Sequence, residues 1–238
     1  NLRYADRLAL FELGPVFVPQ GDGLPDEPFR LGFVLVGQAD PMSWHAESDP
    51  VDFFHGKGVA EALTASLGLT AEFSPDRHPS LHPGRTARIA LADGLAIGHV
   101  GELHPAIVRR LDLADRAVVV GDLDFEAIKA AMSEASAVFQ PFSPYPPVRE
   151  DLAVVVDEAV PAGDVEAALR RGAGDRLADV VLFDVYRGDP VPRGKKSLAW
   201  SITLQAPDRT LTSSDADATR AAIVQALQAE VGGAVRSA

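Results

Sequence analysis

Residues 197–205, near the C-terminus, alternate strictly between two kinds of side chain. The large apolar residues of this segment are Leu198, Trp200, Ile202 and Leu204, and the residues between them are Ser197, Ala199, Ser201 and Thr203. Because successive side chains of a β-strand point to opposite faces of a sheet, this pattern predicts an antiparallel strand with one buried face and one solvated face. The chain must therefore cover one face of a sheet and leave the other open.

The segments around this strand predict a ferredoxin-like sandwich for residues 148–238. Apolar periodicity indicates, in order, a strand at 152–156, a helix at 161–171, strands at 180–186 and 197–205, a helix from 212 to about 229, and a short strand at 234–236. Pro161 suits the first turn of a helix, and Thr212 with Asp215 resembles a capping box. The order β-α-β-β-α-β is that of the split βαβ fold, with both helices on one face of the sheet.

Residues 1–138 predict a separate α+β domain with a largely antiparallel sheet. Strands are expected at 8–18, 31–36, 85–91, 95–100 and 117–123, and an Asp-Gly turn signal lies between the third and the fourth. Helices are expected around Val59, Leu63 and Leu67, after Pro105, and after Asp124. Residues 139–147 carry four prolines, which neither donate to a β-ladder nor continue a helix, so they are predicted to form an extended connector.

Composition excludes several classes of protein. The chain has no cysteine, which excludes disulfides, thiolate metal sites and a cysteine nucleophile. It has no run of eighteen apolar residues that could span a membrane. The formal net charge of −12 argues against unspecific binding of polyanions. Residues 1–144 carry 11 Lys and Arg against 20 Asp and Glu, whereas residues 145–238 carry 11 against 14, so the second part is much closer to neutral.

No residue pattern demands catalysis. His78 and His82 have the spacing of a helical zinc pair, but prolines follow both of them and disfavour helical geometry. His99 is expected to be a partly buried strand residue, and His104 to serve the start of a helix. Neither a complete phosphate-binding loop nor a hydrolase nucleophile motif is present. We therefore expect no catalytic residue and no metal site in this chain.

The strand at 180–186 and the loop after it are the best candidate for a binding site. If the strand alternates regularly, Val181, Phe183 and Val185 share one face, while Asp184 and Tyr186 share the other. A tyrosine on a solvated sheet face can stack an unpaired nucleobase, and neighbouring cations can hold its phosphates. The candidate RNA-binding residues are Tyr186, Arg187, Lys195 and Lys196, with Arg149 and Arg209 as weaker candidates. Ordinary surface positions remain the alternative for each of them.

Four motifs in residues 145–212 resemble the ferredoxin-fold anticodon-binding domain that ends the β subunit of bacterial phenylalanyl-tRNA synthetases. They are Tyr-Pro-Pro-Val-Arg-Glu-Asp-Leu-Ala at 145–153, Phe-Asp-Val-Tyr-Arg-Gly at 183–188, Gly-Lys-Lys-Ser-Leu-Ala at 194–199 and Pro-Asp-Arg-Thr-Leu-Thr at 207–212. The first part is similar to the catalytic-like domain of the same subunit, through Leu-Phe-Glu-Leu-Gly at 10–14, His-Pro-Gly-Arg-Thr-Ala at 82–87 and Gly-His-Val-Gly-Glu-Leu-His-Pro at 98–105.

This resemblance implies a class II synthetase-like but non-catalytic domain at residues 1–138 and an anticodon-binding domain at 148–238. It implies tRNA-Phe and the alpha subunit as partners, in a cytoplasmic heterotetramer of two alpha and two beta subunits. The assembled ligase uses ATP and Mg²⁺, but the chain itself is expected to bind no cofactor, membrane or DNA and to be non-catalytic alone. Because it begins with Asn1, the chain is expected to be part of a longer protein.

Two other classes of function remain open at this point. The same topology serves small-molecule regulatory domains, so the chain could be a stand-alone ferredoxin-fold binding or scaffold module. An independent hydrolase or metalloenzyme is the third possibility, and it requires bound metal in a protein without cysteine.

Overall fold

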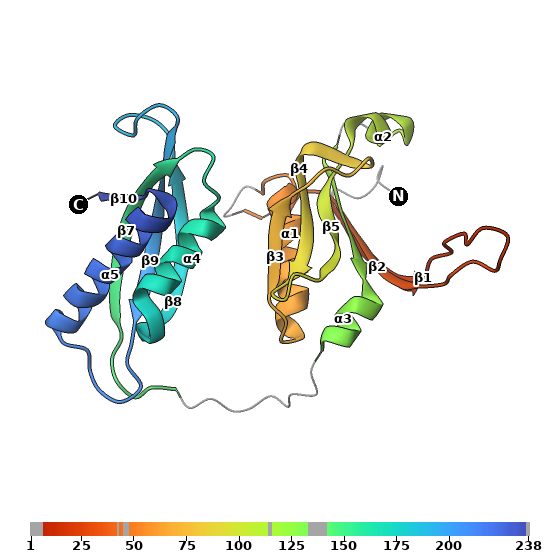
Figure 1. The fold of residues 1–238 in the computed structure, drawn as a ribbon. Helices are drawn as coiled ribbons and strands as arrows, with labels where there is room; N and C mark the ends of the chain where they lie inside the picture. The colour runs from red at the N-terminus through yellow and green to blue at the C-terminus, as the bar shows by residue number, and fades with distance from the viewer. Residues whose placement is uncertain (1–6, 42, 45–47, 114–115, 133–141, 237–238) are drawn as a thin grey trace. The chain divides into compact units, whose positions relative to one another are not determined.

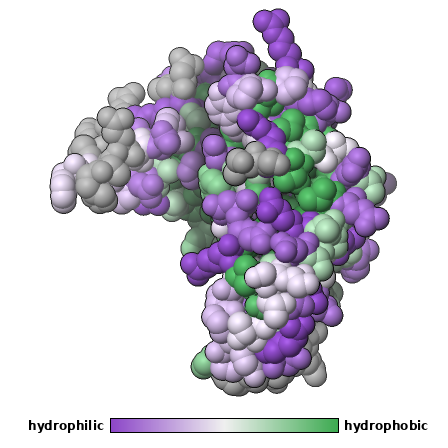
Figure 2. Space-filling model, turned by 90° about the vertical axis from the view of Figure 1, so that its left-hand side faces the viewer, coloured by the Kyte–Doolittle hydropathy of each residue, from purple (hydrophilic) through white to green (hydrophobic). Residues whose placement is uncertain are grey.

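The computed structural model describes residues 7–41, 43–44, 48–113, 116–132 and 142–236 (Figure 1). The chain forms two compact units, Asn1–Ser136 and Ala137–Ala238. The Pro-rich segment predicted as a connector begins outside the described residues and ends directly before the first strand of the second unit. Hydrophilic side chains cover most of the molecular face in Figure 2, and apolar side chains gather there in smaller patches.

The first unit is a six-stranded antiparallel sheet with helices packed on one face. The strand order is β1-β2-β6-β5-β4-β3. The strands are β1 (Arg7–Pro15), β2 (Phe29–Gly37), β3 (Ala71–Pro75), β4 (Leu81–Leu91), β5 (Ala96–Leu103) and β6 (Val118–Asp124), and the helices are α1 (Phe53–Ser66), α2 (Pro105–Arg110) and α3 (Phe125–Ala131). Ala60 of α1 and Ile128 of α3 share one buried cluster with Phe33 and Leu123 of the sheet, so α1 and α3 cover the same face.

The predicted strands and helices of the first unit are confirmed, with two differences at the sheet edges. Strand β1 ends at Pro15 rather than at residue 18. Beyond it, the Val16 N–H donates to the Pro28 carbonyl, and Val18 and Asp26 form an isolated bridge. Proline has no N–H to donate to a ladder, which is consistent with an end to regular pairing there. Strand β3 was not predicted, because its five residues include only one large apolar side chain, Phe73.

The second unit has the predicted β-α-β-β-α-β order. Its sheet has the strand order β10-β7-β9-β8 and all its pairs are antiparallel. The elements are β7 (Val148–Asp157), α4 (Ala162–Ala173), a 3-10 turn η1 (Gly174–Arg176), β8 (Leu177–Tyr186), β9 (Lys195–Leu204), α5 (Ser213–Val231) and β10 (Ala234–Arg236). Pro161 is the N-cap of α4, and Thr212 with Asp215 forms the predicted capping box of α5.

Both helices of this unit pack on one face of its sheet. Val165 and Leu169 of α4, together with Ile223 and Leu227 of α5, share a buried cluster with the apolar row of β9. Trp200 is the largest fully buried side chain of that row. The alternation predicted for β9 is therefore confirmed, and no helix of this unit packs against the other face within the described residues (Figure 1).

Helices α4 and α5 lie close together at Gly172, which gives a stability prediction. A Cβ built at Gly172 would lie 2.6 Å from Ile223 Cα. Because this neighbour is a backbone atom, one of the two helices would have to shift to make room. Gly172→Ala is therefore expected to destabilise the unit by about 1–3 kcal/mol, although alanine is the better helix former. Gly163→Ala in the same helix is the control, because its Cβ meets nothing within 4 Å. Urea unfolding followed through buried Trp200, with exposed Trp44 replaced by phenylalanine, measures both variants, and equal stability of the two would contradict the packing described.

Candidate nucleic-acid interface

The helix-free face of the second unit is formed by the four strands of its sheet, and Tyr186 lies on β8, the edge strand beside β9. Tyr186 pairs with Ser197, and Asp184 pairs with Ala199, so both β8 residues lie on the face that the helices leave open. Tyr186 is 46% exposed. Its partner Ser197 and the next β9 residue on this face, Ala199, are small, and Lys195 is the other same-face neighbour on that strand. The prediction that Tyr186 and Asp184 share the open face is confirmed.

The prediction that Val181, Phe183 and Val185 share one face is wrong. The register between β8 and β9 shifts between Leu182 and Asp184, which leaves Phe183 as an extra residue without a partner in the register. Such a bulge reverses the alternation beyond it. Val181 therefore lies on the open face, whereas Val185 lies on the helix side. The bulge is what places both Val181 and Tyr186, five positions apart, on the open face.

The loop after β8 holds the ring of Tyr186 in place. The Tyr186 hydroxyl donates a hydrogen bond of 2.9 Å to the backbone carbonyl of Asp189. Gly188 has φ +138°, and a Cβ built on it would lie 3.1 Å from the Tyr186 hydroxyl oxygen. Glycine is suited to this position both by its backbone conformation and by the space that the tyrosine occupies. The ring is exposed yet fixed in orientation, which reduces the entropy lost when a base stacks on it.

Arg187, after β8, and Lys195 and Lys196, at the start of β9, contact the end of β7 and the turn that follows it. Arg187 donates to Glu158 Oε1 from Nε at 3.0 Å and from Nη2 at 2.8 Å. Lys195 Nζ lies 2.7 Å from Asp157 Oδ1, and Lys196 Nζ donates to the Glu158 carbonyl at 3.0 Å. The structure thus brings Arg187, Lys195 and Lys196 together, as the sequence suggested. It also shows each of them already engaged.

The two acidic residues of this turn were missed by the sequence analysis. The hydrogen bond from Arg187 lowers the pKa of Glu158 below its ordinary value, so the carboxylate stays charged at neutral pH. The predicted strand ended at residue 156, and a pairing of Glu158 with a loop thirty residues later leaves no periodic signal. Exposed ion pairs of this kind contribute little to stability. Phosphates can therefore compete with Asp157 and Glu158 for the cations.

The two weaker candidates lie away from Tyr186. Arg149 pairs with Thr203 on the open face, six residues along β9 from the partner of Tyr186, which is about 20 Å at strand spacing. Arg209 donates two hydrogen bonds to Asp215, at 2.6 and 2.9 Å, and so supports the capping box of α5. These bonds, together with those from Thr212, hold the pKa of Asp215 far below its ordinary value.

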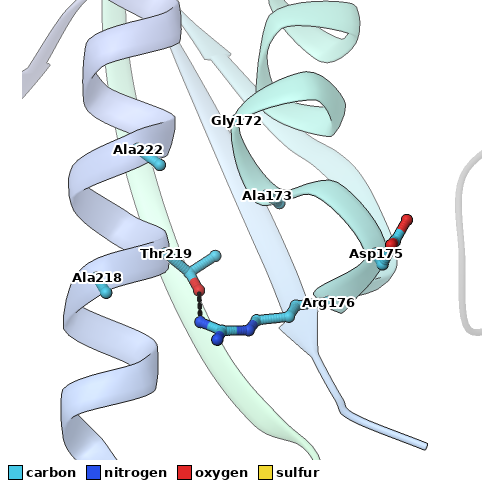
Figure 3. Close-up of a pocket in the computed structure, with 7 residues that line it drawn as sticks. All are labelled: Gly172, Ala173, Asp175, Arg176, Ala218, Thr219 and Ala222. Carbon is cyan, nitrogen blue, oxygen red and sulfur yellow. Dashed lines mark hydrogen bonds between the residues drawn. The ribbon is translucent and has the colours of Figure 1, made fainter.

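The helical side of this unit carries a shallow hollow of about 340 Å³ between the end of α4 and the middle of α5 (Figure 3). Mostly small residues line it: Gly172, Ala173, Asp175, Arg176, Ala218, Thr219 and Ala222. The Arg176 guanidinium donates to Thr219 Oγ1 at 2.9 Å and to the Asp215 carbonyl at 3.1 Å, so it is occupied within the protein. We assign this hollow to helix packing.

The histidines of the first unit have structural partners. His104 caps α2 by accepting from the Ala106 N–H at 3.1 Å, as predicted. His99 is a half-buried strand residue, also as predicted, and its Nε2 lies 2.9 Å from Asp76 Oδ2. Within the described ranges, no group of three or more His, Asp or Glu side chains could hold a metal ion. In the same part of the chain, no helix is long and apolar enough to cross a membrane.

Comparison with known proteins identifies the family. Residues 1–125 match the model of the phenylalanyl tRNA synthetase beta chain CLM domain. The chain belongs to the phenylalanyl-tRNA synthetase beta chain family. Residues 143–236, which include the open sheet face, match the ferredoxin-fold anticodon binding domain. The predicted fold of the second unit and the predicted family are both confirmed.

Curated members of this family cover almost the whole chain. Phenylalanine–tRNA ligase beta subunits from Symbiobacterium thermophilum, Vibrio cholerae and Geobacillus kaustophilus are 42%, 41% and 39% identical to it over 97%, 98% and 98% of its length. The aligned region is 26% of the first of these relatives and 29% of the other two. The chain therefore spans little more than a quarter of the relatives that it matches.

Proposed function

We propose that the second unit binds the anticodon loop of a tRNA on the helix-free face of its sheet. The observation that carries this proposal is the exposed, fixed ring of Tyr186 on that face, with Arg187 next to it in the chain and Lys195 on the same face of β9, two residues from Ser197, the partner of Tyr186. The match of residues 143–236 to an anticodon-binding domain supports it independently. An anticodon loop supplies unpaired bases, which are the usual targets of sequence-specific RNA recognition.

We propose a different task for each group of residues. The Tyr186 ring stacks one unpaired base of the loop. Arg187, Lys195 and Lys196 hold the adjoining phosphates, exchanging their contacts with Asp157 and Glu158 for contacts with the RNA. Arg149, at the far end of the same face, reaches a phosphate about 20 Å away from the stacked base. Arg209 remains a candidate contact at the start of α5.

The partners follow from the relatives, and they are part of this proposal. The RNA is tRNA-Phe, the protein partner is the alpha subunit, and the assembly is a cytoplasmic heterotetramer of two alpha and two beta subunits that attaches phenylalanine to its tRNA. The first unit is a non-catalytic domain of class II synthetase type. We propose that the assembled ligase uses ATP and Mg²⁺ and that this chain binds neither of them. A stand-alone small-molecule or scaffold module is not favoured by the family match.

A titration with two RNAs tests the proposed function. The chain is mixed with tRNA-Phe, or with the same tRNA carrying an anticodon loop of unrelated sequence, and the dissociation constants are compared at one fixed salt concentration. We expect weaker binding of the altered tRNA. Its phosphates can still be contacted, but the bases that are recognised by stacking and by hydrogen bonds to their edges have changed. Equal affinity for both RNAs would mean that this unit does not recognise the anticodon loop and binds RNA only through unspecific electrostatic contacts.

A further inference from the structure

Two sequence motifs of the first unit meet at one corner of its sheet. They are His-Pro-Gly-Arg-Thr-Ala at residues 82–87 and Gly-His-Val-Gly-Glu-Leu-His-Pro at residues 98–105. The first lies at the start of β4, and the second runs along β5 to the first residue of α2 (Figure 1). Binding of an anticodon loop by the second unit gives neither motif a role. We refer to residues 82–86 together with residues 102–106 as the β4–β5 corner.

A bulge at the start of β4 exposes the first of these motifs. Leu81 pairs with Leu103 and Thr86 pairs with Gly101, so five steps along β4 correspond to only two steps along β5. The surplus residues, 82–85, are therefore pushed out of the ladder. A Cβ built on Gly101 would lie 2.8 Å from a carbonyl oxygen of the bulge, so this glycine lets the bulge lie against β5.

A buried carboxylate holds the one arginine of the bulge. Arg85 Nη1 donates to Glu102 Oε2 at 2.7 Å. The side chain of Glu102 is only 11% exposed, whereas that of Arg85 is 58% exposed. Within the part of the chain that the structure describes, Arg85 Nε and Nη2 have no hydrogen-bond partner. The guanidinium is therefore fixed through one nitrogen and offers its remaining N–H groups to a ligand.

Backbone hydrogen bonds fix the tautomers of two histidines at the corner. His82 Nδ1 accepts from the Gly84 N–H at 3.1 Å, and His104 Nδ1 accepts from the Ala106 N–H at 3.1 Å. A neutral imidazole that accepts at Nδ1 carries its proton on Nε2. Within the described ranges, neither Nε2 atom has a hydrogen-bond partner, and both rings are half-buried. Together with Arg85, the two rings make the β4–β5 corner a surface of side-chain donors.

The charge around the corner favours an anionic partner. Residues 77–111 carry five arginines against two acidic residues, Asp93 and Glu102. Asp93 lies in the turn between β4 and β5, at the opposite end of this hairpin, and Glu102 is neutralised by Arg85. Residues 1–76, in contrast, carry four Lys and Arg against twelve Asp and Glu. A phosphate can therefore approach the first unit at this corner, whereas residues 1–76 repel it.

We propose that the β4–β5 corner binds phosphate groups of the tRNA outside its anticodon arm. This inference rests on the proposed function, because the RNA is the one that the second unit binds. A phosphate presents only acceptor oxygens, which match the Arg85 guanidinium and the Nε2–H groups of His82 and His104. Such contacts carry no sequence information, so the corner adds affinity and fixes the position of the tRNA without reading its bases.

A comparison of two RNAs tests the corner. His82→Asp with His104→Asp keeps an acceptor for the Gly84 and Ala106 N–H groups, because an aspartate accepts from the backbone N–H two residues on, as these imidazoles do. The variant loses both Nε2–H donors and gains two negative charges. We expect it to bind whole tRNA-Phe at least about tenfold more weakly than the unchanged chain does, and to bind the isolated anticodon stem-loop equally well. Dissociation constants at one fixed salt concentration measure both, and thermal melts check that the variants fold.

Two further variants separate the donors from general electrostatics. His82→Asn with His104→Asn also keeps the backbone hydrogen bonds but adds no charge, so its loss of affinity for whole tRNA-Phe should be smaller, roughly two- to fivefold. Ala62→Asp with Thr70→Asp adds two negative charges at exposed positions of the same unit, on α1 and before β3. It should leave both affinities within about twofold of those of the unchanged chain, because salt screens distant surface charges. An equal loss in this variant would attribute the effect to net charge and overturn the corner.

Each contrary outcome identifies a different failure. Unchanged binding of whole tRNA-Phe by the aspartate variant refutes the corner, and the RNA-binding proposal stands if Tyr186→Ala still weakens binding of both RNAs. Equal losses for whole tRNA-Phe and for the stem-loop also refute it, because the corner then acts on the anticodon arm or through the fold. If tRNA binding is unchanged but the variant binds the alpha subunit more weakly, carboxylates of that subunit occupy the corner instead. If the unchanged chain binds neither RNA, both this inference and the proposed function fail.

Discussion

Replacing Tyr186 with alanine is expected to weaken binding of an anticodon stem-loop by about 5- to 150-fold, which corresponds to the ~1–3 kcal/mol typical of a stacked base. The ring is exposed on the open face, so its removal takes away the stacking surface while leaving the buried core intact. Fluorescence anisotropy with a labelled stem-loop measures the dissociation constant, and a thermal melt checks the fold.

Two matched variants separate stacking from other effects at this position. Tyr186→Phe keeps the ring and loses only the hydroxyl bond to Asp189, so most of the affinity should remain. Val185→Ala changes the neighbouring residue on the helix side and should leave RNA binding unaltered. Unchanged affinity of Tyr186→Ala, or an equal loss in Tyr186→Phe, would rule out base stacking as the role of this ring.

Neutralising Arg187, Lys195 and Lys196 is expected to reduce the salt dependence of RNA binding. For single-stranded RNA, log K falls with log salt by about 0.7 for each neutralised phosphate. A triple variant, Arg187→Gln with Lys195→Gln and Lys196→Gln, should therefore have a slope smaller in magnitude by about 2. At low salt the affinity should fall more than tenfold. The slope is measured from dissociation constants between roughly 50 and 200 mM salt.

Two further variants control this experiment. Arg170→Gln removes a cation from α4, the helix that packs on the opposite face of the sheet. It should leave the slope of log K against log salt unchanged. Glu158→Gln removes the carboxylate that holds Arg187, so it should tighten RNA binding severalfold by freeing the guanidinium. Weaker binding of Glu158→Gln would mean that Glu158 positions Arg187 for the RNA rather than competing for it. The same slope in the triple variant and the unchanged chain would exclude phosphate contacts by this loop.

Regular periodicity made the element order of the second unit predictable, and that of the first unit except for β3. The alternation of β9 and the caps at Thr212 and His104 are local signals, and each was confirmed. The start of β7 was missed because Arg149, Glu150 and Asp151 resemble a charged loop. In the structure, these residues pair with the last part of β9, a long-range contact without local periodicity.

The candidate site was predictable in its residue types but not in its geometry. The bulge at Phe183 leaves no sequence signal, yet it decides which residues share the open face with Tyr186. The contacts of Arg187 and Lys195 with Glu158 and Asp157 join segments about thirty residues apart. Sequence patterns report the period of a single element, whereas these features depend on how two elements meet.

Contact between the helix-free face of the second unit and the anticodon loop can be tested by an NMR titration. The ¹⁵N-labelled chain is titrated with the anticodon stem-loop of tRNA-Phe, and backbone amide shifts are mapped onto the sheet and the helices. Large shifts are expected at Tyr186, Ser197 and Ala199 and small ones along α4 and α5. Shifts concentrated on the two helices, with the amides of β8 and β9 unmoved, would contradict it.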